Sequence, residues 1–305
     1  MHLTDIFKLH RTTFSFEFFP AKTAESAREL FDNIRELEPL RPAFVSATYG
    51  AGGSTRELTH DLVVKLKAST TLDPIPHLTC VNHDEAEIDA ILERYAAAGI
   101  SNIMTLRGDV PRDLAEGVDP WRSFRYASQL VRKINQFNER NLHPDKRGFG
   151  IAVAGYPEGH AETPNRLIEI DRLKAKVDEG AGAIVTQLFF DNRDFYDFRS
   201  RCELAGIRVP IVAGIMPITS ATGMKRMAEL ALGARYPASL IRAINRTGGD
   251  EASVRRVGVH WATEQSRDLL DHNVAGIHFY TLNRSKGTRE IYETLGVKDS
   301  LSLQQ

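Results

Sequence analysis

Several features that mark other classes of protein are scarce or missing in this chain of 305 residues. The cysteines, Cys80 and Cys202, lie far apart and fit neither a metal-binding nor a redox spacing. Two buried, small apolar side chains are the favoured interpretation of this pair, and a reducing cytoplasm is the expected location. No run of about 18 apolar residues occurs, so we expect no membrane span. The first twenty residues also lack the basic-then-apolar pattern of a signal peptide.

Neither the charge balance nor the histidine spacing indicates binding of nucleic acid or of a metal ion. The 39 basic residues are matched by 40 acidic ones, so nothing indicates the basic surface that nucleic-acid binding requires. The ten histidines include no His-Glu-x-x-His and no other paired ligand spacing, and we expect no catalytic metal.

Eight short apolar runs are present, and most are bounded by Gly, Pro, Asn or Asp, as is typical of buried parallel strands. They are residues 14–19, 44–50, 75–81, 102–109, 149–157, 183–190, 210–217 and 276–283. Apolar residues at three- and four-residue steps predict helices between the runs. The clearest are residues 24–37, 55–68, 85–98 and 166–179, and Gly99, Gly180 and Gly206 are suited to ending helices.

This alternation predicts parallel βαβ units, and eight of them favour a closed (β/α)₈ TIM barrel, expected as a single domain over residues 1–305. The alternative is an open doubly wound sheet, which normally has a glycine-rich turn after its first strand. Here the first run ends in Phe-Phe-Pro, which weakens that alternative. Residues 218–256 should hold two or three short helices broken at Pro237 and Gly248–Gly249, and residues 300–305 are expected to be frayed.

Active sites of such barrels form at the carboxyl ends of the strands. Glu17 is unusual there because Phe16, Phe18 and Phe19 flank it in the sequence. Poor solvation among aromatic rings should raise the pKa of its carboxyl group, which suits a general acid near neutral pH. The alternative is a structural glutamate paired with a buried Lys or Arg.

Asp109 ends another run in Arg-Gly-Asp, where Gly108 allows close approach of a ligand to the backbone. An aspartate that caps a helix or a turn is the alternative. Glu17 and Asp109 could also form a glycosidase pair, although Trp121 is the one tryptophan expected near a loop. The glycine-rich residues 50–55 could bind phosphate, but a tight turn capped by Ser54 or Thr55 is favoured because no Gly-Lys-Ser/Thr follows.

Eight motifs at these run ends form a recognisable series. They are Ser15-Phe16-Glu17-Phe18-Phe19-Pro20, Thr48-Tyr49-Gly50-Ala51-Gly52-Gly53, Pro76-His77-Leu78-Thr79-Cys80, Leu106-Arg107-Gly108-Asp109, Tyr156-Pro157-Glu158, Thr186-Gln187, Gly214-Ile215-Met216-Pro217 and His278-Phe279-Tyr280-Thr281-Leu282-Asn283-Arg284. In this order, and over nearly the whole chain, they resemble the methylenetetrahydrofolate reductases of the short bacterial type.

The resemblance implies a (β/α)₈ barrel that holds FAD non-covalently. It implies hydride transfer from NAD(P)H, with NADH favoured, to the flavin, and then to 5,10-methylenetetrahydrofolate to give 5-methyltetrahydrofolate. The two substrates would alternate at one flavin face, in one-carbon metabolism and methionine biosynthesis. A cytoplasmic homo-oligomer is expected, without a domain for feedback by S-adenosylmethionine.

The resemblance also assigns roles to individual residues. Glu17 would be the acid that protonates N10 of the folate, and Asp109 would bind the pterin close to the flavin pyrimidine. Gln187 would serve both substrates, and Tyr280 and Arg284 would bind the folate. The residues that match FAD-binding positions are Thr48, Tyr49, Ala51, His77, Arg107, Gly108, Asp109, Tyr126, Ala127, Tyr156, His160, Glu169, Arg172 and Lys176. Arg107, Arg172 and Lys176 would face the diphosphate, whereas a solvated helix face is the alternative for Glu169 and Lys176.

The chain departs from the family pattern in two places. Ala221 stands where other members have a stacking Phe, Gly223 where they have a polar residue, and the segment 111–120 is longer than expected. Two other functions stay open: a flavin- or folate-binding barrel without turnover, and a barrel hydrolase that uses Glu17 and Asp109. The presence of Glu17, Asp109 and Gln187 together argues against a barrel without turnover.

Overall fold

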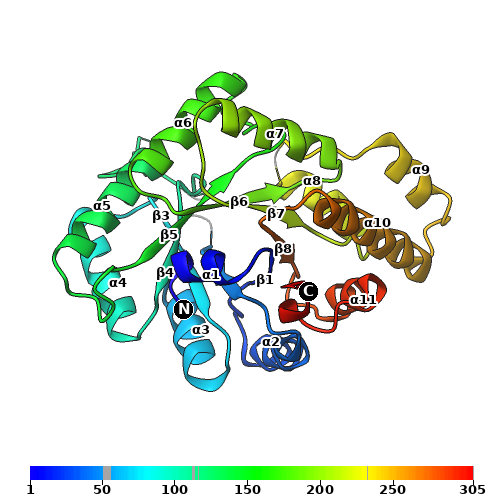
Figure 1. Ribbon diagram of the computed structural model, residues 1–305, viewed down its shortest axis with the longest axis horizontal. Helices are drawn as coiled ribbons and strands as arrows, with labels where there is room; N and C mark the ends of the chain where they lie inside the picture. Colours follow the sequence, from blue (N-terminus) through cyan, green and yellow to red (C-terminus); the bar gives the residue numbers. More distant parts are fainter. Residues whose placement is uncertain (51–55, 112–113, 116, 232, 305) are drawn as a thin grey trace.

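The computed structural model describes residues 1–50, 56–111, 114–115, 117–231 and 233–304. Eight parallel strands close into a barrel in chain order, with β1 hydrogen-bonded to β8 (Figure 1). The strands are β1 (Thr13–Phe18), β2 (Phe44–Ala47), β3 (Pro74–Thr79), β4 (Asn102–Leu106), β5 (Gly150–Gly155), β6 (Ala183–Leu188), β7 (Ile211–Ile215) and β8 (Gly276–Tyr280). The predicted barrel and all eight predicted strands are confirmed.

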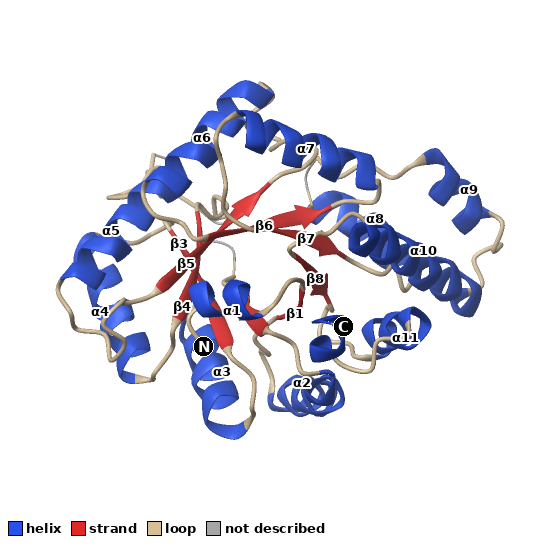
Figure 2. Ribbon diagram, in the orientation of Figure 1, coloured by secondary structure: helices blue, strands red, loops and turns tan. Residues whose placement is uncertain are grey.

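All of the described α-helices except the first lie in the outer layer around the strands (Figure 2). The helices in the described residues are α1 (Leu3–Leu9), α2 (Ala24–Leu37), α3 (Arg56–Ser69), α4 (Glu85–Ala97), α5 (Ala127–Glu139), α6 (Arg166–Asp178), α7 (Asn192–Leu204), α8 (Ala221–Leu230), α9 (Ala238–Asn245), α10 (Glu251–Asp271) and α11 (Lys286–Leu295), with short 3₁₀ helices η1 (Glu38–Leu40) and η3 (Ser300–Gln304). The breaks at Pro237 and Gly248–Gly249 separate α8, α9 and α10, as predicted. None of the described helices has the length and apolar content needed to cross a bilayer.

The main apolar core lies between the strands and the helices. Phe14 of β1 meets Tyr292 of α11 with ring centroids 5.0 Å apart, and Phe16 and Phe18 belong to the same buried cluster. Because successive side chains of a strand point to opposite faces, Ser15 and Glu17 point into the barrel. The strand therefore separates Glu17 from the phenylalanines beside it in the sequence.

The amino-terminal end of the barrel is filled by α1. Leu3 and Ile6 are buried there against Phe44, Ile75 and Met104. The Leu3 backbone N–H donates to Asn102 Oδ1 at 2.6 Å, which fixes α1 to the start of β4. This helix was not predicted, and it leaves the opposite end of the barrel, where the strands end, for a ligand.

The expectation that residues 300–305 are frayed is wrong for the described part of this segment. Residues Ser300–Gln304 form η3, and Ser300 is buried. The Ser300 hydroxyl contacts Leu40 O and Tyr292 Oη at 3.1 Å each, and Leu303 packs on the main core. A buried hydroxyl bonded to the distant Leu40 O, and a leucine packed on the main core, therefore hold the segment in place.

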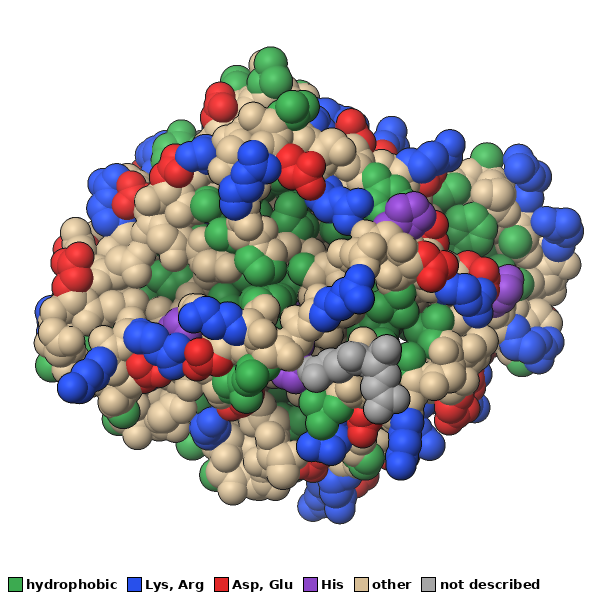
Figure 3. All heavy atoms as spheres, viewed as in Figure 1, with side chains coloured by type: hydrophobic (Ala, Val, Ile, Leu, Met, Phe, Trp, Pro, Cys, Tyr) green, Lys and Arg blue, Asp and Glu red, His purple; other side chains and the backbone are tan. Residues whose placement is uncertain are grey.

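Basic and acidic side chains are interspersed over the face of the molecule in Figure 3, as the near-zero net charge leads one to expect. No group of three or more His, Cys, Asp or Glu side chains in the described residues is arranged to hold a metal ion.

Candidate active site

Glu17 lies inside the carboxyl end of the barrel, on β1 between Ser46 of β2 and Tyr280 of β8. It is 6% exposed, and its Oε2 lies 3.7 Å from Nε2 of His77 on β3. Burial raises the pKa of the Glu17 carboxyl to about 8 and lowers the pKa of His77 to about 4. Near neutral pH, Glu17 is therefore protonated and His77 is neutral.

The predicted direction of this pKa shift is confirmed, but the reason given for it is wrong. Phe16 and Phe18 point into the layer between strand and helices, and Phe19 is exposed after the end of β1, so none of them surrounds the carboxyl group. Its desolvation comes from its position inside the barrel. Among the described residues, no Lys or Arg forms an ion pair with Glu17, so the structural ion pair considered as an alternative is not found.

A buried, hydrogen-bonded group of side chains lies on β1 and on the two strands that pair with it. His278 on β8 contacts Ser15 Oγ through Nδ1 at 2.8 Å and Ser46 Oγ through Nε2 at 3.1 Å, and its ring stacks on Phe44. Burial lowers the pKa of His278 to about 3, so the ring stays neutral. This group was not predicted, although Ser15 and His278 alternate with apolar residues as inward-facing side chains should.

The end of β4 brings Arg107, Gly108 and Asp109 to the barrel mouth. Gly108 has φ +81°, and a Cβ there would lie 2.9 Å from the Thr79 Cβ, so a larger residue would be strained and crowded. Asp109 follows with an exposed side chain. Burial, with a further contribution from the Asp109 charge, raises the pKa of Tyr156 above its usual range. Asp109 is thus near the β5 side of the mouth.

A cavity of about 330 Å³ opens between β4, β5, α5 and α6. Many of the predicted FAD-binding side chains line it: Arg107, Tyr126, Ala127, Tyr156, His160, Glu169, Arg172 and Lys176. Thr48, Tyr49 and His77 lie instead on β3 or at the end of β2, on the Glu17 side of the barrel mouth, and Ala51 falls outside the described residues. The predicted set is therefore divided between the barrel mouth and this lateral cavity.

The charged side chains of the cavity differ in exposure: Glu169 is buried, Lys176 is half-buried and Arg172 is exposed. Glu169 Oε2 accepts from the His160 backbone N–H at 3.0 Å, while its Oε1 is buried without a hydrogen-bond partner. Lys176 Nζ donates to Ala154 O at 2.5 Å, and burial lowers the pKa of this amine to about 8. Arg172 donates to Thr163 Oγ1 at 2.6 Å and lies 5.3 Å above the Tyr126 ring. Because Glu169 is buried, the alternative of a solvated helix face is wrong for it.

The predicted substrate residues lie on the other side of the mouth. Gln187 is half-buried near the end of β6, and its Oε1 accepts from the Leu188 N–H at 2.9 Å. Tyr280 donates its hydroxyl to Thr186 O at 2.8 Å, and a Cβ on Gly214 would lie 2.7 Å from its ring. Arg284 is exposed in the loop after β8.

One of the two departures from the family pattern, at Ala221 and Gly223, falls in the first turn of α8. The other, the segment 111–120, lies partly outside the described residues. The Gly223 N–H donates to the Ser220 side chain that caps α8, at 2.9 Å. A Cβ at Gly223 would lie 2.8 Å from that hydroxyl oxygen, so glycine suits this close cap. Ala221 lies one residue after the cap and is half-buried.

Two ion-pair clusters at the barrel mouth were not found from the sequence. Arg107 pairs with Glu162 at 2.5 Å, and its guanidinium lies 4.0 Å from the Trp121 ring centroid. Arg235 pairs with Glu158 at 3.0 Å and with Asp194 at 2.6 Å, which joins the loops after β5 and α8 to the start of α7. These partners are far apart in sequence and follow no fixed spacing, so no sequence pattern could have paired them.

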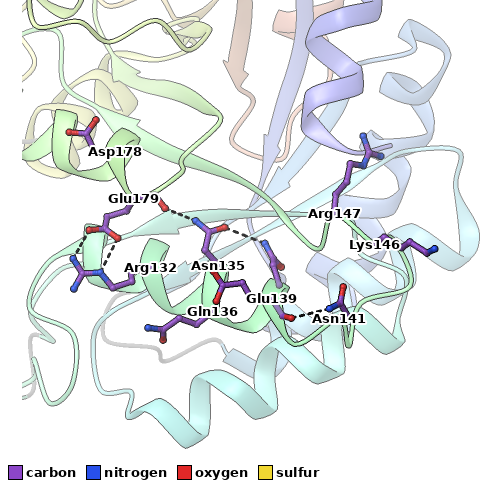
Figure 4. Close-up of a pocket in the computed structure, with 10 residues that line it drawn as sticks. Arg132, Asn135, Gln136, Glu139, Asn141, Lys146, Arg147, Asp178 and Glu179 are labelled. Atoms are coloured by element: carbon purple, nitrogen blue, oxygen red, sulfur yellow. Dashed lines mark hydrogen bonds and ion pairs between the residues drawn. The ribbon is translucent and has the colours of Figure 1, made fainter.

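A larger hollow of about 690 Å³ lies between the carboxyl-terminal ends of α5 and α6. Arg132 and Asn135 donate hydrogen bonds to Glu179 there, so many of the polar groups that line the hollow are already paired (Figure 4). It lies at the amino-terminal end of the barrel, which in this fold supports stability and not catalysis.

Comparisons with known proteins agree with the motifs. The family model of methylenetetrahydrofolate reductase matches residues 2–296. The chain is 38% identical over 298 residues to methylenetetrahydrofolate reductase (NADH) 1 of Arabidopsis thaliana, covering 95% of this chain and 49% of that protein. It is 36% identical over 287 residues to 5,10-methylenetetrahydrofolate reductase of Escherichia coli K12, covering 94% and 92%. The chain thus spans about half the length of the plant relative and of a Schizosaccharomyces pombe one, of which it covers 47%.

Solved structures share the fold at low sequence identity. An uncharacterized protein from Clostridium thermocellum, which binds two copies of 5-methyl-5,6,7,8-tetrahydrofolic acid, gives a TM-score of 0.64 at 13% identity, covering 97% of this chain and 99% of that one. An oxaloacetate acetylhydrolase gives 0.53 at 11% identity, covering 96% and 84%. These two likenesses concern the barrel alone.

Proposed function

This chain belongs to the methylenetetrahydrofolate reductase family, and on that premise we propose that it reduces 5,10-methylenetetrahydrofolate to 5-methyltetrahydrofolate, with FAD as cofactor and NADH as the favoured donor. The observation that carries the proposal is Glu17, a buried carboxylic acid at the carboxyl end of a barrel strand. With a pKa of about 8, it holds a proton at neutral pH. A reaction that must protonate a weakly basic nitrogen needs such a group.

The cavity residues fit a dinucleotide. Arg107, Arg172 and Lys176 would hold the diphosphate, because all three are cationic and line the cavity. Glu169 has one buried oxygen without a partner, which suits a ligand hydroxyl that donates to it. His77 Nε2 and Thr79 Oγ1 are also buried without a hydrogen-bond partner, at the barrel mouth, where the flavin ring would lie. When bound, FAD supplies a ring that takes a hydride from the nicotinamide and gives one to the methylene carbon of the folate.

The protein's own contribution to the folate step is the proton of Glu17. Protonation of N10 opens the five-membered ring of the substrate and leaves an electrophilic carbon that accepts hydride. Asp109 would bind the pterin, and Gln187, Tyr280 and Arg284 would contact the substrates from the β6 and β8 sides. Both substrates would use this one mouth in turn.

The two competing functions are less well supported. A glycosidase-like hydrolase would use Glu17 and Asp109 as its carboxyl pair, but the family match over residues 2–296 does not favour it. A binding protein without turnover would have no use for a buried acid whose desolvation costs stability whenever it ionises. We also propose that the enzyme works in the cytoplasm as a homo-oligomer, in one-carbon metabolism and methionine biosynthesis.

One anaerobic titration tests the proposal. Protein loaded with FAD should lose its flavin absorbance when NADH is added, and regain it when methylenetetrahydrofolate follows. Bleaching without reoxidation would support a flavoprotein that does not reduce folate. Failure to hold FAD would overturn the proposal altogether.

A further inference from the structure

Arg107, one of the cationic residues of the lateral cavity, is already engaged by three groups. Its Nη1 donates to Glu162 at 2.5 Å, and its Nε donates to the Arg125 carbonyl at 3.3 Å. Its guanidinium also lies over the Trp121 ring, 4.0 Å from the centroid. The ring and the carbonyl come from the loop before α5, whereas Glu162 comes from the loop between β5 and α6.

The charge of Glu162 interacts with His160 and Arg172 as well as with Arg107. The hydrogen bond from Arg107, with weaker contributions from His160 and Arg172, lowers the pKa of its carboxyl group. Glu162 in turn opposes the fall in the pKa of His160 that burial causes. Glu162 is therefore an anion beside Arg107 and Arg172, which line this cavity, and its own side chain is 56% exposed.

A bound diphosphate would compete with Glu162 for the same charges. The stacking on Trp121 and the bond to Arg125 O hold the guanidinium in place, so Arg107 cannot easily turn to a second anion. Two anionic acceptors beside one guanidinium repel each other. An exposed ion pair is also only weakly stabilising, so the Glu162 carboxylate can leave at small cost.

We propose that Glu162 is an internal counter-ion of the cavity, which holds Arg107 when no anionic ligand is present and shortens the lifetime of bound FAD by competing for it. The inference rests on the proposed function, because it takes the diphosphate of FAD as the anion that arrives. The opposite role is that Glu162 orients Arg107 for the diphosphate, in which case removing the carboxylate would loosen FAD.

The test is the rate at which the full chain releases FAD, followed as the rise in flavin fluorescence after dilution. Glu162→Gln should release FAD about 2–5-fold more slowly than the wild type, the range expected for one exposed charge pair. Glu162→Asp keeps the charge and should release FAD at close to the wild-type rate.

Glu179→Gln is the matched control, because it also removes one acid that is paired with an arginine. Its partner Arg132 is on α5, and neither side chain of this pair, drawn in Figure 4, lines the lateral cavity. Its release rate should equal that of the wild type. Equal slowing in both variants would mean that net charge alone sets the rate, and the inference would be wrong.

An unchanged or faster release from Glu162→Gln would overturn the inference, while the proposed function would stand if the anaerobic titration succeeds. If the wild-type protein retains no FAD, both fall. Thermal unfolding of each variant checks that the folded state is intact.

Discussion

Burial gives Glu17 and His77 opposite preferences for a proton. Their side chains are 3.7 Å apart, and desolvation disfavours the charged form of each. The carboxylic acid therefore keeps its proton and the imidazole stays neutral, so the proton lies on the residue that we propose as the acid of the folate step. A general acid whose pKa lies near the working pH can both hold and donate its proton.

Replacement of Glu17 by Gln should separate the two halves of the proposed reaction. Hydride transfer from NADH needs no proton from Glu17, so reduction of the flavin should continue near the wild-type rate. Folate reduction should slow by about 10²–10⁴-fold, the usual contribution of general acid catalysis. Stopped-flow absorbance of each half-reaction measures both rates.

The pH dependence supplies the control for this variant. Only the protonated form of Glu17 can donate, so in the wild type the folate step should decline as pH rises through about 8. That decline should be absent from the residual rate of Glu17→Gln. An equal loss in both half-reactions would show that Glu17 supports the flavin pocket and is not the acid.

Asp109 should act through its negative charge. Asp109→Asn should raise the midpoint potential of bound FAD, because a nearby negative charge disfavours the electron-rich reduced ring. It should also slow the folate half-reaction, since a pterin contact changes. Spectroscopic titration against reference dyes measures the potential, and a lower potential in the variant would place Asp109 away from the flavin.

At the residue scale, the sequence located the acid but not its surroundings. Glu17 stood out because a carboxylate inside an apolar run is unusual, and its burial and raised pKa are confirmed. Its neighbours His77 and Tyr280 come from other strands, so strand pairing alone brings them together. The pairing of Arg107 with Glu162 was beyond prediction for the same reason, since 55 residues separate them.

At the scale of elements, strong periodic signals were reliable and short ones were not. The eight apolar runs gave the strands, although each strand ends before its run does, because the last residues of the runs turn into the loops of the barrel mouth. The seven-residue α1 was missed because one turn of apolar spacing carries little information. The segment η3 was missed because its order depends on tertiary contacts, above all the hydrogen bond from Ser300 to Leu40 O, whose partners are 260 residues apart in sequence.

A single hydroxyl tests whether η3 is part of the stable fold. Ser300→Ala should lower the free energy of unfolding by about 1 kcal/mol, because it leaves buried partners without their hydrogen bonds. Ser302→Ala is the control, since its hydroxyl bonds to Asp299 O within the same turn, and its effect should be smaller. Urea unfolding measures both, and equal stability of Ser300→Ala and wild type would mean that the segment contributes nothing.

At the scale of the whole molecule, the two ends of the barrel have different tasks. Glu17, Asp109, Gln187 and the lateral cavity lie toward the carboxyl ends of the strands, where polar groups are left without partners. The amino-terminal end is closed by α1, whose Leu3 and Ile6 fill the barrel beneath β2, β3 and β4. The mouth can therefore keep strained or unpaired groups, because packing at the other end stabilises the strands that carry them.

This division predicts that damage to α1 changes stability without changing chemistry. Ile6 is fully buried, so Ile6→Ala should lower the free energy of unfolding by about 2–5 kcal/mol, from lost burial and the cavity left behind. Leu9→Ala in the same helix removes a side chain that is 61% exposed and should have little effect.

Urea unfolding measures the stability, and kcat/KM is compared at a temperature where every variant is fully folded. Both variants should match the wild type there, because α1 is separated from Glu17 by the buried layer that contains Phe44 and His278. A fall in kcat/KM for folded Ile6→Ala would show that packing at the base sets the geometry of the mouth, and the two ends would then have to be treated as one coupled unit.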